Sequence, residues 1–527
     1  MITGKNYVGS QLLASGTTTY RTINPQLNIE NPWTFTEAST EEIEQAVQLA
    51  HHAFKTYKDF PAEQKAAFLN GIADEILALG DSLLEIYCTE SGFLRGRAES
   101  ERGRTVFQLR TFASMLLEGS WVEATIDTAI PDRSPLPKED LRKMLTPLGP
   151  VVVFGSSNFP FAFSTAGGDT ASALAAGCPV IVKSHSMHIG TGEKVASAII
   201  NAAKKHNMPE GVFSNLIGGG VTLGATLVKH PLVKAVGFTG SITGGRALFD
   251  LASQRPEPIP VFAEMGSINP VVILPEAIEK NSKKWATAYA SSITLGSGQF
   301  CTNPGLLLAI KGKHLDAFLN DLTQEIEKIA PSCMLHPSIK SDFNKGKEKI
   351  RAQNGVTTIA EYKEETAPNF APQTILSVEG KTFLENKTLS HEVFGPFSIV
   401  VQCENSEEVT TIIDKLDGQL TGTILAEPDE ILKYNAVVNA LQNRVGRLIF
   451  NGVPTGVEVC ASMLHGGPYP SSSDARFTAV GIHAVKRWVR PFSYQNWPDE
   501  LLPEALQNKN PLNINRTVND ILTNKPI

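Results

Sequence analysis

The sequence predicts an α/β protein that is built on two open parallel sheets. Its 527 residues exceed what one small core can hold and suggest two or three domains, at roughly 150 residues each. From residue 148 onward, short and uniformly apolar runs alternate with amphipathic helical stretches. Such runs are typical of parallel strands that helices cover on both faces. A second alternating set follows residue 264, which predicts a second domain of the same kind.

The composition excludes several classes of protein. Hydrophobic residues make up 42% of the chain and charged residues 19%, the ordinary proportions of a soluble enzyme. The net charge of −7, with no basic cluster, argues against nucleic acid or an anionic membrane as partner. The six cysteines are scattered without C-x-x-C pairs, so they indicate a reducing compartment and no zinc signature. There is no signal-peptide core and no apolar run of the roughly 20 residues that a membrane helix needs. We therefore expect a cytoplasmic protein without a metal site.

The N-terminal part is predicted to be mainly helical after residues 1–38, which read as short extended segments and turns. Ser39 and Glu42 form a capping-box pattern, in which each side chain bonds the backbone amide of the other residue. The helix that follows places its apolar residues on one face, and a second helix over residues 63–79 repeats this spacing. A third, long helix is predicted over residues 99–117.

Four apolar runs are the predicted strands of the first sheet. They lie at residues 151–154, 180–182, 212–213 and 235–238, with helices near residues 168–176, 192–206 and 221–229. Open parallel sheets bind ligands at the C-terminal ends of their strands. Asn158, Lys183, Gly240 and Ser241 all follow such strands. We expect a cofactor to lie along this edge of the sheet.

The second alternating set predicts a second α/β domain that ends near residue 467. Its first elements are an apolar run at 271–274, a helix over 285–294 and a strand at 306–310. Residues 124–148 are rich in charge and proline and match the core of neither domain. The end of the chain, over residues 496–527, is a polar tail that contains proline.

One cysteine follows a glycine-rich break directly after the helix that ends at Thr294. Gly296 and Gly298 let the backbone turn tightly and approach a ligand, because they carry no Cβ. Cys301, presented on such a turn, can be reached by a substrate. The alternative is that Cys301 is a small buried hydrophobe, as most free cysteines are. The break is not a dinucleotide fingerprint, since it lacks the third glycine and follows no strand.

This stretch resembles the nucleophile loop of the aldehyde dehydrogenase superfamily, and four other segments match that family in the same order. They are Ser157–Pro160, Val182–Lys183, Gly237–Ser241 with Glu264–Gly266, and Glu392–Pro396. The resemblance runs from about residue 39 to about residue 490. It implies an aldehyde dehydrogenase-like fold, with a small β element that joins subunits into a homo-oligomer, a dimer or a tetramer. The implied parts are a cofactor-binding domain (1–123 and 149–265), a catalytic domain (266–467), the oligomerisation element (124–148 and 478–495, with a strand at Val485–Val489) and the tail (496–527).

The resemblance also implies the catalytic roles. Cys301 is the nucleophile that adds to the aldehyde carbon, and Asn158 with the backbone N–H of Cys301 would bind the oxyanion. Glu264 would activate the water that hydrolyses the thioester. Read from the residues alone, Asn158 could be an ordinary turn asparagine. Glu264 could be a glutamate that caps a helix or forms an ion pair at the domain junction. Met265 stands where many relatives have leucine. His391 and His465 adjoin matching segments and are assigned no role.

Six residues are implied in cofactor binding: Lys183, Ser186, Gly240, Ser241, Glu392 and Phe394. Lys183 would reach ribose or phosphate, Gly240 and Ser241 the pyrophosphate, and Glu392 the nicotinamide ribose. In relatives that prefer NAD, a glutamate stands three residues after the lysine, and here Ser186 takes that place. A serine can donate to a 2′-phosphate that a carboxylate would repel. We therefore predict that NADP is accepted at least as well as NAD.

Further stretches resemble one branch of the family, the α-ketoglutarate semialdehyde (2,5-dioxopentanoate) dehydrogenases. These stretches are Glu101–Thr105, Ala166–Gly177, Gln299–Gly305 and Pro454–Val459. Phe159 and Phe163 would line the inner tunnel. The predicted third helix carries three candidates for binding the substrate carboxylate, each of which could instead face water: Arg102, Arg104 and Arg110.

Three alternatives remain beside this function. Some of the same loops resemble long-chain fatty-aldehyde dehydrogenases, whose substrate needs only an apolar groove. A coenzyme A-acylating enzyme is disfavoured by Glu264, which that branch usually lacks. A non-catalytic binding protein on the same fold is disfavoured because Cys301, Asn158, Lys183 and Glu264 are all present.

Overall fold

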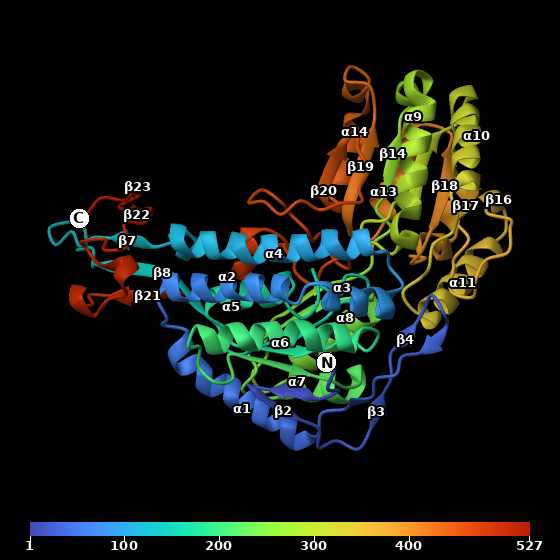
Figure 1. The fold of residues 1–527 in the computed structure, drawn as a ribbon. Helices are drawn as coiled ribbons and strands as arrows, with labels where there is room; N and C mark the ends of the chain where they lie inside the picture. The colour runs from blue at the N-terminus through green and yellow to red at the C-terminus, as the bar shows by residue number, and fades with distance from the viewer.

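A computed structural model describes residues 1–527 and divides them among three main sheets (Figure 1). Two sheets have seven strands each and belong to the two larger domains, while the third has five strands and forms an arm. The N-terminus lies on the first domain and the C-terminus on the arm. No helix is both long enough and apolar enough to cross a bilayer.

The first sheet has the strand order β13-β12-β9-β10-β11-β1-β2. The first five strands in this order, from β13 to β11, are parallel. Its strands are β1 (Asn6–Val8), β2 (Gln11–Leu13), β9 (Val151–Phe154), β10 (Val180–Lys183), β11 (Phe213–Leu216), β12 (Ala235–Thr239) and β13 (Val261–Glu264). Every residue of β9, β10 and β11 is buried. The apolar runs predicted this for β9 and β10, whereas β11 extends beyond the predicted run at 212–213 and buries Ser214 and Asn215. The short strands β3 (Thr19–Tyr20), β4 (Ile23–Asn24), β5 (Ile29–Glu30) and β6 (Phe35–Thr36) form two separate ribbons.

Helices cover both faces of this sheet because alternate strand residues point to opposite sides. Val151, Val153 and Val182 share one core with helices α2 to α6, whereas Val152 and Ile181 share another with α1, α7 and α8. The helices are α1 (Thr40–Tyr57), α2 (Ala62–Ala78), α3 (Asp81–Ser91), α4 (Arg95–Glu118), α5 (Gly168–Ala176), α6 (Ile189–Lys205), α7 (Ala225–Lys229) and α8 (Ile242–Ser253). A doubly wound parallel sheet is therefore confirmed.

Two helix starts bear on the sequence predictions. The capping box of α1 is confirmed, since the Ser39 hydroxyl accepts from the Glu42 amide at 3.2 Å and the Glu42 carboxylate accepts from the Ser39 amide at 2.9 Å. Helix α4 begins at Arg95, one turn earlier than predicted. This extra turn places Arg97 on the helix, on the side that faces the second domain.

The second sheet has the order β16-β17-β18-β15-β14-β19-β20, with only β16 antiparallel. Its strands are β14 (Val271–Ile273), β15 (Leu306–Ile310), β16 (Thr357–Glu361), β17 (Thr374–Glu379), β18 (Phe397–Cys403), β19 (Gln419–Leu425) and β20 (Val445–Phe450). The helices are α9 (Pro275–Thr294), α10 (Lys313–Lys328), α11 (Pro337–Arg351), α12 (Gly380–Glu385), α13 (Ser406–Lys415) and α14 (Asn435–Gln442). Two cores, one on each face, hold the layers together.

The arm corrects two predictions. Its sheet has the order β21-β8-β7-β22-β23, from β7 (Thr125–Asp127), β8 (Leu141–Pro147), β21 (Val489–Gln495), β22 (Arg516–Val518) and β23 (Ile521–Thr523). The strand expected at Val485–Val489 begins only at Val489. Residues 482–488 form a 3₁₀ helix, in which Trp488 is fully buried and donates to the Ser172 hydroxyl of α5 at 2.8 Å. This anchor holds the chain against the first domain, so pairing with β8 starts after it.

The segment described as a tail also belongs to the arm. Strand β22 lies parallel to β7, and β23 closes the edge of the sheet. Arg516 is only 1% exposed, and its guanidinium donates to the carbonyls of Ala505 and Asn508 at 3.3 and 3.0 Å. The polar composition misled the prediction because a buried arginine here satisfies backbone carbonyls, which an apolar pattern does not reveal.

Candidate active site

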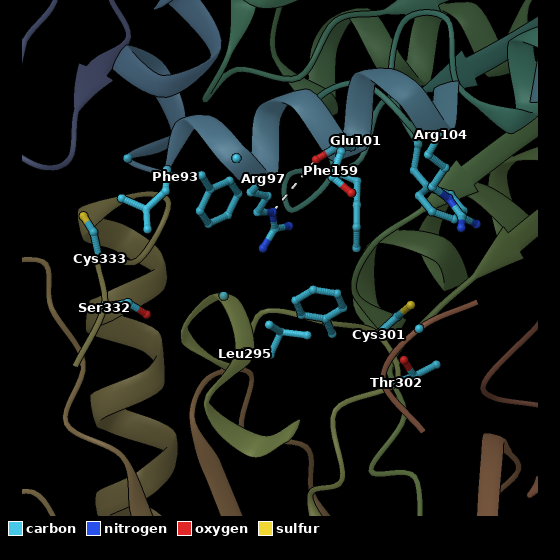
Figure 2. Close-up of a pocket in the computed structure, with 18 of the residues that line it drawn as sticks. Phe93, Arg97, Glu101, Arg104, Phe159, Leu295, Cys301, Thr302, Ser332 and Cys333 are labelled. Carbon is cyan, nitrogen blue, oxygen red and sulfur yellow. Dashed lines mark ion pairs between the residues drawn. The ribbon is translucent and has the colours of Figure 1, made fainter. Parts of the chain in front are cut away.

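The site lies where the C-terminal edge of the first sheet meets the glycine-rich loop of the second domain. Two cavities open there, of about 820 and 340 Å³, and both are lined by Phe159, Phe163 and Cys301. The wider one runs along α4 (Figure 2). The smaller one reaches the start of α8 and the segment Glu392–Phe394. Cys301 thus stands between a space for a substrate and a space for a second ligand.

Backbone geometry places Cys301 at this junction. Gly296, Ser297 and Gly298 have φ angles of 55°, 57° and 64°, so three consecutive residues after α9 are left-handed. Gly298 packs against the backbone of Gly395, which leaves no room for a Cβ. Asn269 donates to the carbonyl of Cys301 at 2.9 Å and fixes the end of the turn. The turn therefore keeps Cys301 out of α9 and on the walls of both cavities.

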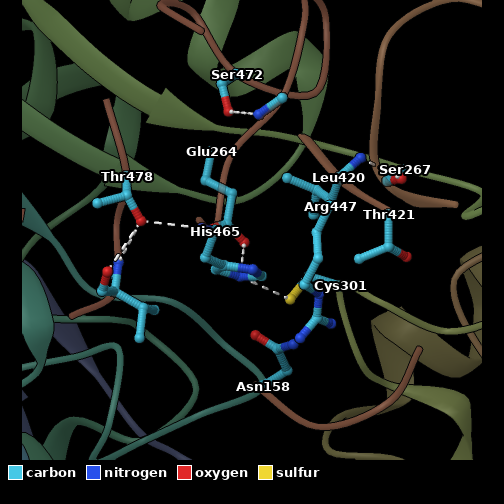
Figure 3. Close-up of polar contacts among 12 residues, drawn as sticks. Asn158, Glu264, Ser267, Cys301, Leu420, Thr421, Arg447, His465, Ser472 and Thr478 are labelled. Atoms are coloured by element: carbon cyan, nitrogen blue, oxygen red, sulfur yellow. Dashed lines mark hydrogen bonds and ion pairs between the residues drawn. The ribbon is translucent and has the colours of Figure 1, made fainter. Parts of the chain in front are cut away.

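A histidine and a carboxylate lie beside the thiol (Figure 3). The Sγ of Cys301 is 3.4 Å from Nε2 of His465, and that nitrogen is 3.0 Å from Oε1 of Glu264. His465 is 2% exposed and Glu264 5%. Burial of the sulfur raises the pKa of Cys301 well above its usual value, and the negative Glu264 raises it further. The thiol therefore needs a base before it can react, and the imidazole is within reach to take its proton.

His465 was assigned no role from the sequence. It lies 164 residues beyond Cys301, and no spacing rule joins them. The hydroxyl of Thr478 accepts from the backbone amide of His465 at 2.9 Å, which holds the loop that carries the imidazole. Only the fold brings this side chain to the thiol.

Asn158 lies on the opposite side of the thiol from Glu264 (Figure 3). It is 8% exposed and lines the smaller cavity, and its side-chain amide donates to the Gln299 carbonyl at 3.0 Å. Helix α4 holds its loop in place. The buried carboxylate of Glu101 accepts from the amides of Phe161 and Ala162 at 2.7 and 3.0 Å. The second N–H of the Asn158 amide is thus left for an oxyanion.

Four of the six predicted cofactor residues line the smaller cavity: Gly240, Ser241, Glu392 and Phe394. Ser241 is the N-cap of α8, where its hydroxyl accepts from the Gly244 amide at 3.2 Å. A helix N-terminus entered through glycine fits a pyrophosphate, because its free amides point at the anion.

The other two predicted cofactor residues, Lys183 and Ser186, stand apart from this cavity. Lys183 ends β10 and is 8% exposed, and burial lowers its pKa to about 8. Ser186 is exposed in the turn between β10 and α6. Both residues still lie at the C-terminal edge of the sheet, where the far end of an extended dinucleotide would reach them.

Of the three arginines proposed to bind a carboxylate, only Arg104 lines the wider cavity. Its Nη1 donates to the Val457 carbonyl, while Nε and Nη2 are buried without a partner. The expectation is wrong for Arg110, which pairs with Asp74 at 3.0 Å on the surface, and for Arg102, which donates to the Gly80 carbonyl at 3.4 Å. At about 100° per residue, these two side chains leave α4 on faces other than that of Arg104.

Arg97 is a cavity residue that the sequence analysis did not select (Figure 2). It stands seven residues before Arg104, so the two share one face of α4. Its guanidinium lies over the ring of Phe93, 3.8 Å from the centroid, and Nη2 donates to the Asn158 carbonyl at 2.7 Å. Nη1 is buried without a partner. The sequence offers no signal that selects it, because Arg95 and Arg102 are also seven residues apart and do not line the cavity.

Known proteins resemble this chain over almost its whole length. The model of the aldehyde dehydrogenase family matches residues 13–490. Alpha-ketoglutaric semialdehyde dehydrogenase 2 of Azospirillum brasilense is 47% identical, over 98% of each chain. Alpha-ketoglutaric semialdehyde dehydrogenase of Acinetobacter baylyi is 43% identical, over 99% of each chain.

Solved structures share the fold at lower identity. Betaine aldehyde dehydrogenase from Staphylococcus aureus in complex with NAD⁺ aligns with a TM-score of 0.81 at 20% identity, over 94% of this chain and 95% of that one. A 1-pyrroline-5-carboxylate dehydrogenase from Thermus with bound NAD aligns with a TM-score of 0.79 at 22% identity, over 93% and 92% of the two chains. The predicted fold class is thereby confirmed.

Proposed function

The chain belongs to the aldehyde dehydrogenase family, and from this premise we propose that it oxidises α-ketoglutarate semialdehyde to 2-oxoglutarate with NADP. The reaction class is that of an oxidoreductase acting on the aldehyde group. One structural observation carries the choice of substrate: Arg97 and Arg104 both line the cavity that holds Cys301, and each has N–H groups without a hydrogen-bond partner. Two relatives at 47% and 43% identity bear the name of this activity.

The first chemical step is the addition of the thiol to the aldehyde. His465 takes the proton of Cys301, and the carboxylate of Glu264 stabilises the resulting imidazolium. The oxyanion of the thiohemiacetal is bound by the Asn158 amide and the backbone N–H of Cys301. Bound NADP supplies the hydride acceptor. Gly240, Ser241, Glu392 and Phe394, which line the smaller cavity with Cys301, would hold the cofactor there.

The second step hydrolyses the thioester on Cys301. Glu264 lines the smaller cavity together with Cys301; its Oε1 lies 3.0 Å from Nε2 of His465, and its Oε2 has no hydrogen-bond partner. It can therefore take a proton from a water that attacks the acyl carbon. This role is compatible with the first step, since addition and hydrolysis follow one another.

The wider cavity suits a keto acid better than an alkyl chain. Its lining includes the apolar side chains of Phe93, Leu94 and Leu295, but α4 also places Arg104 in this lining, at the end of the cavity where Cys301 lies. A guanidinium with unpartnered N–H groups is destabilised by contact with hydrocarbon and stabilised by hydrogen bonds to a carboxylate. Long-chain aldehydes would leave Arg97 and Arg104 unsatisfied, so we rank them behind the keto acid.

Replacing Arg104 should separate these substrates. Arg104→Ala is expected to lower kcat/KM for α-ketoglutarate semialdehyde roughly 10- to 100-fold, since a charge-assisted hydrogen bond contributes about 1.5–3 kcal/mol. Activity on hexanal and decanal should stay unchanged or rise. Initial rates on the three aldehydes measure this. Arg110→Ala is the matched control, because Arg110 lies on the surface with Asp74.

Efficient turnover of decanal by the wild type, with negligible turnover of the keto-aldehyde, would contradict the substrate. If Arg104→Ala behaves like Arg110→Ala while the keto-aldehyde remains the best substrate, then the anchor is a different residue. Arg97→Ala is then the next variant to measure.

The preference for NADP is proposed from Ser186. Its side chain is exposed in the turn after β10, three residues beyond Lys183, so nothing covers the hydroxyl. Ser186→Glu should lower kcat/KM for NADP relative to NAD by at least about tenfold, because a carboxylate repels the 2′-phosphate. The neutral Ser186→Gln is the matched control for size. An unchanged NADP/NAD ratio in Ser186→Glu would rule out this contact.

We also propose that the enzyme is a cytoplasmic homo-oligomer. The arm exposes apolar side chains on its sheet, among them Phe492 at 40%, Ile521 at 67% and Leu522 at 72%. Edge strand β20 exposes Phe450 at 49%. Exposed apolar edges of this kind favour association with a second copy. All six cysteines are free, which suits a reducing compartment.

A further inference from the structure

The reactive cluster contains three different metal-ligating groups. The Sγ of Cys301, Nε2 of His465 and a carboxylate oxygen of Glu264 all lie within 4.8 Å of one another. They come from the end of strand β13 and from two loops, far apart in the sequence, so no ligand-spacing motif predicts them. We propose that this cluster binds Zn²⁺ reversibly and that the bound ion holds the enzyme inactive.

The distances suit a tetrahedral ion. Zinc bonds of about 2.3 Å to sulfur and 2.0–2.1 Å to nitrogen and oxygen place S and N roughly 3.5 Å apart and N and O roughly 3.3 Å apart. The observed separations are 3.4 Å between Cys301 and His465 and 3.0 Å between His465 and Glu264. These two separations need shifts of only a few tenths of an ångström, and the sulfur and the carboxylate oxygen, which lie within 4.8 Å of each other, would close on the ion. Cysteine, histidine and glutamate are also the ligands that zinc prefers.

The charges of the cluster favour a dication. Both oxygens of Glu264 are buried, in a residue that is 5% exposed, and its ion-pair partner is His465, whose Nε2 lies 3.0 Å from Oε1. A zinc ion that displaces the thiol proton would be bound by a thiolate, a carboxylate and an imidazole nitrogen. Arg104 and Arg447, whose charges act on Cys301, oppose the ion. The site is therefore expected to bind and release zinc rather than keep it permanently.

The two cavities give an ion access to the cluster. Cys301 and His465 line the wider cavity, and Cys301 and Glu264 line the smaller one. The fourth position of the ion is open to water from these cavities. Zinc would occupy the sulfur lone pair that attacks the aldehyde, so the ion and the aldehyde compete. This consequence rests on the proposed function, whereas the metal site itself does not.

Binding is tested directly, without an activity assay. Cofactor-free enzyme titrated with Co²⁺ should develop the thiolate-to-cobalt absorption band with one ion per chain, and Zn²⁺ should remove the band. Cys301→Ser should abolish it. His465→Phe and Glu264→Gln should each weaken binding at least about tenfold, because each removes one ligand. Cys460→Ser, a partly exposed thiol outside the cluster, is the matched control and should bind as the wild type does.

Kinetics then test the inhibition. Zn²⁺ at micromolar concentrations should inhibit aldehyde oxidation competitively with the aldehyde, and a chelator should restore the rate, whereas Mg²⁺ and Ca²⁺ prefer oxygen ligands and should have no effect. Cobalt binding that is equal in the wild type and in Cys301→Ser would overturn the site. A cobalt band in an enzyme that oxidises no aldehyde would leave the site standing and refute the proposed function instead. An active enzyme with no band and no inhibition refutes only the zinc site.

Discussion

Cys301→Ala should abolish aldehyde oxidation, lowering kcat by at least about 10³-fold, while cofactor binding stays close to that of the wild type. The reason is that no other group can form the covalent intermediate. The thiol lies on the wall shared by the two cavities, and His465 is a base within reach of it, at 3.4 Å. Initial rates measure the loss, and quenching of protein fluorescence by NADP measures binding.

The matched control for this variant is Cys460→Ala, which removes a thiol outside the cluster. It should oxidise aldehyde at the wild-type rate. If Cys301→Ala keeps a substantial fraction of the activity, then the reaction does not pass through a thiohemiacetal. If both activity and NADP binding are lost, the cysteine has a structural role, as its alternative interpretation as a small buried hydrophobe requires.

Glu264→Gln should stop the enzyme after one turnover. The amide keeps the shape of the side chain but cannot accept a proton from water, so the thioester accumulates. Rapid mixing should show a burst of up to one reduced cofactor per active site. The steady-state rate that follows should be lower than that of the wild type by about 10²- to 10⁴-fold.

The rate of that burst reports on a second role of the same carboxylate. Because Oε1 of Glu264 lies 3.0 Å from His465, the amide should also slow proton removal from Cys301, and the burst should be slower than in the wild type. Full steady-state turnover in Glu264→Gln would place the base elsewhere. A turnover that requires added coenzyme A, in the wild type as well as the variant, would indicate the acylating branch of the family.

The order of elements in both domains could be predicted from the sequence. Buried parallel strands such as Val151–Phe154 must be apolar on both faces, and their short runs differ from the helical spacing between them. The capping box of Ser39 and Glu42 depends on neighbours three residues apart. The Cys301 loop could be recognised for the same reason, since its glycines and its cysteine lie close together in the sequence.

Only the tertiary structure decided which side chains meet at the site. Arg97 and Arg104 face the cavity while Arg102 and Arg110 do not, because the surroundings of α4 determine which face is covered. The polar tail contributes two strands to the arm, and the buried Arg516 satisfies carbonyls of the same segment.

The same distinction explains why His465 was missed. Local order follows from contacts within a few residues, and these leave a periodic pattern in the sequence. The meeting of Cys301, Glu264 and His465 joins the end of strand β13 to two loops, over a separation of up to 201 residues, from 264 to 465. Each of these segments is placed by its own packing and hydrogen bonds, so the sequence determined the elements of this protein, and only their assembly determined its reactive cluster.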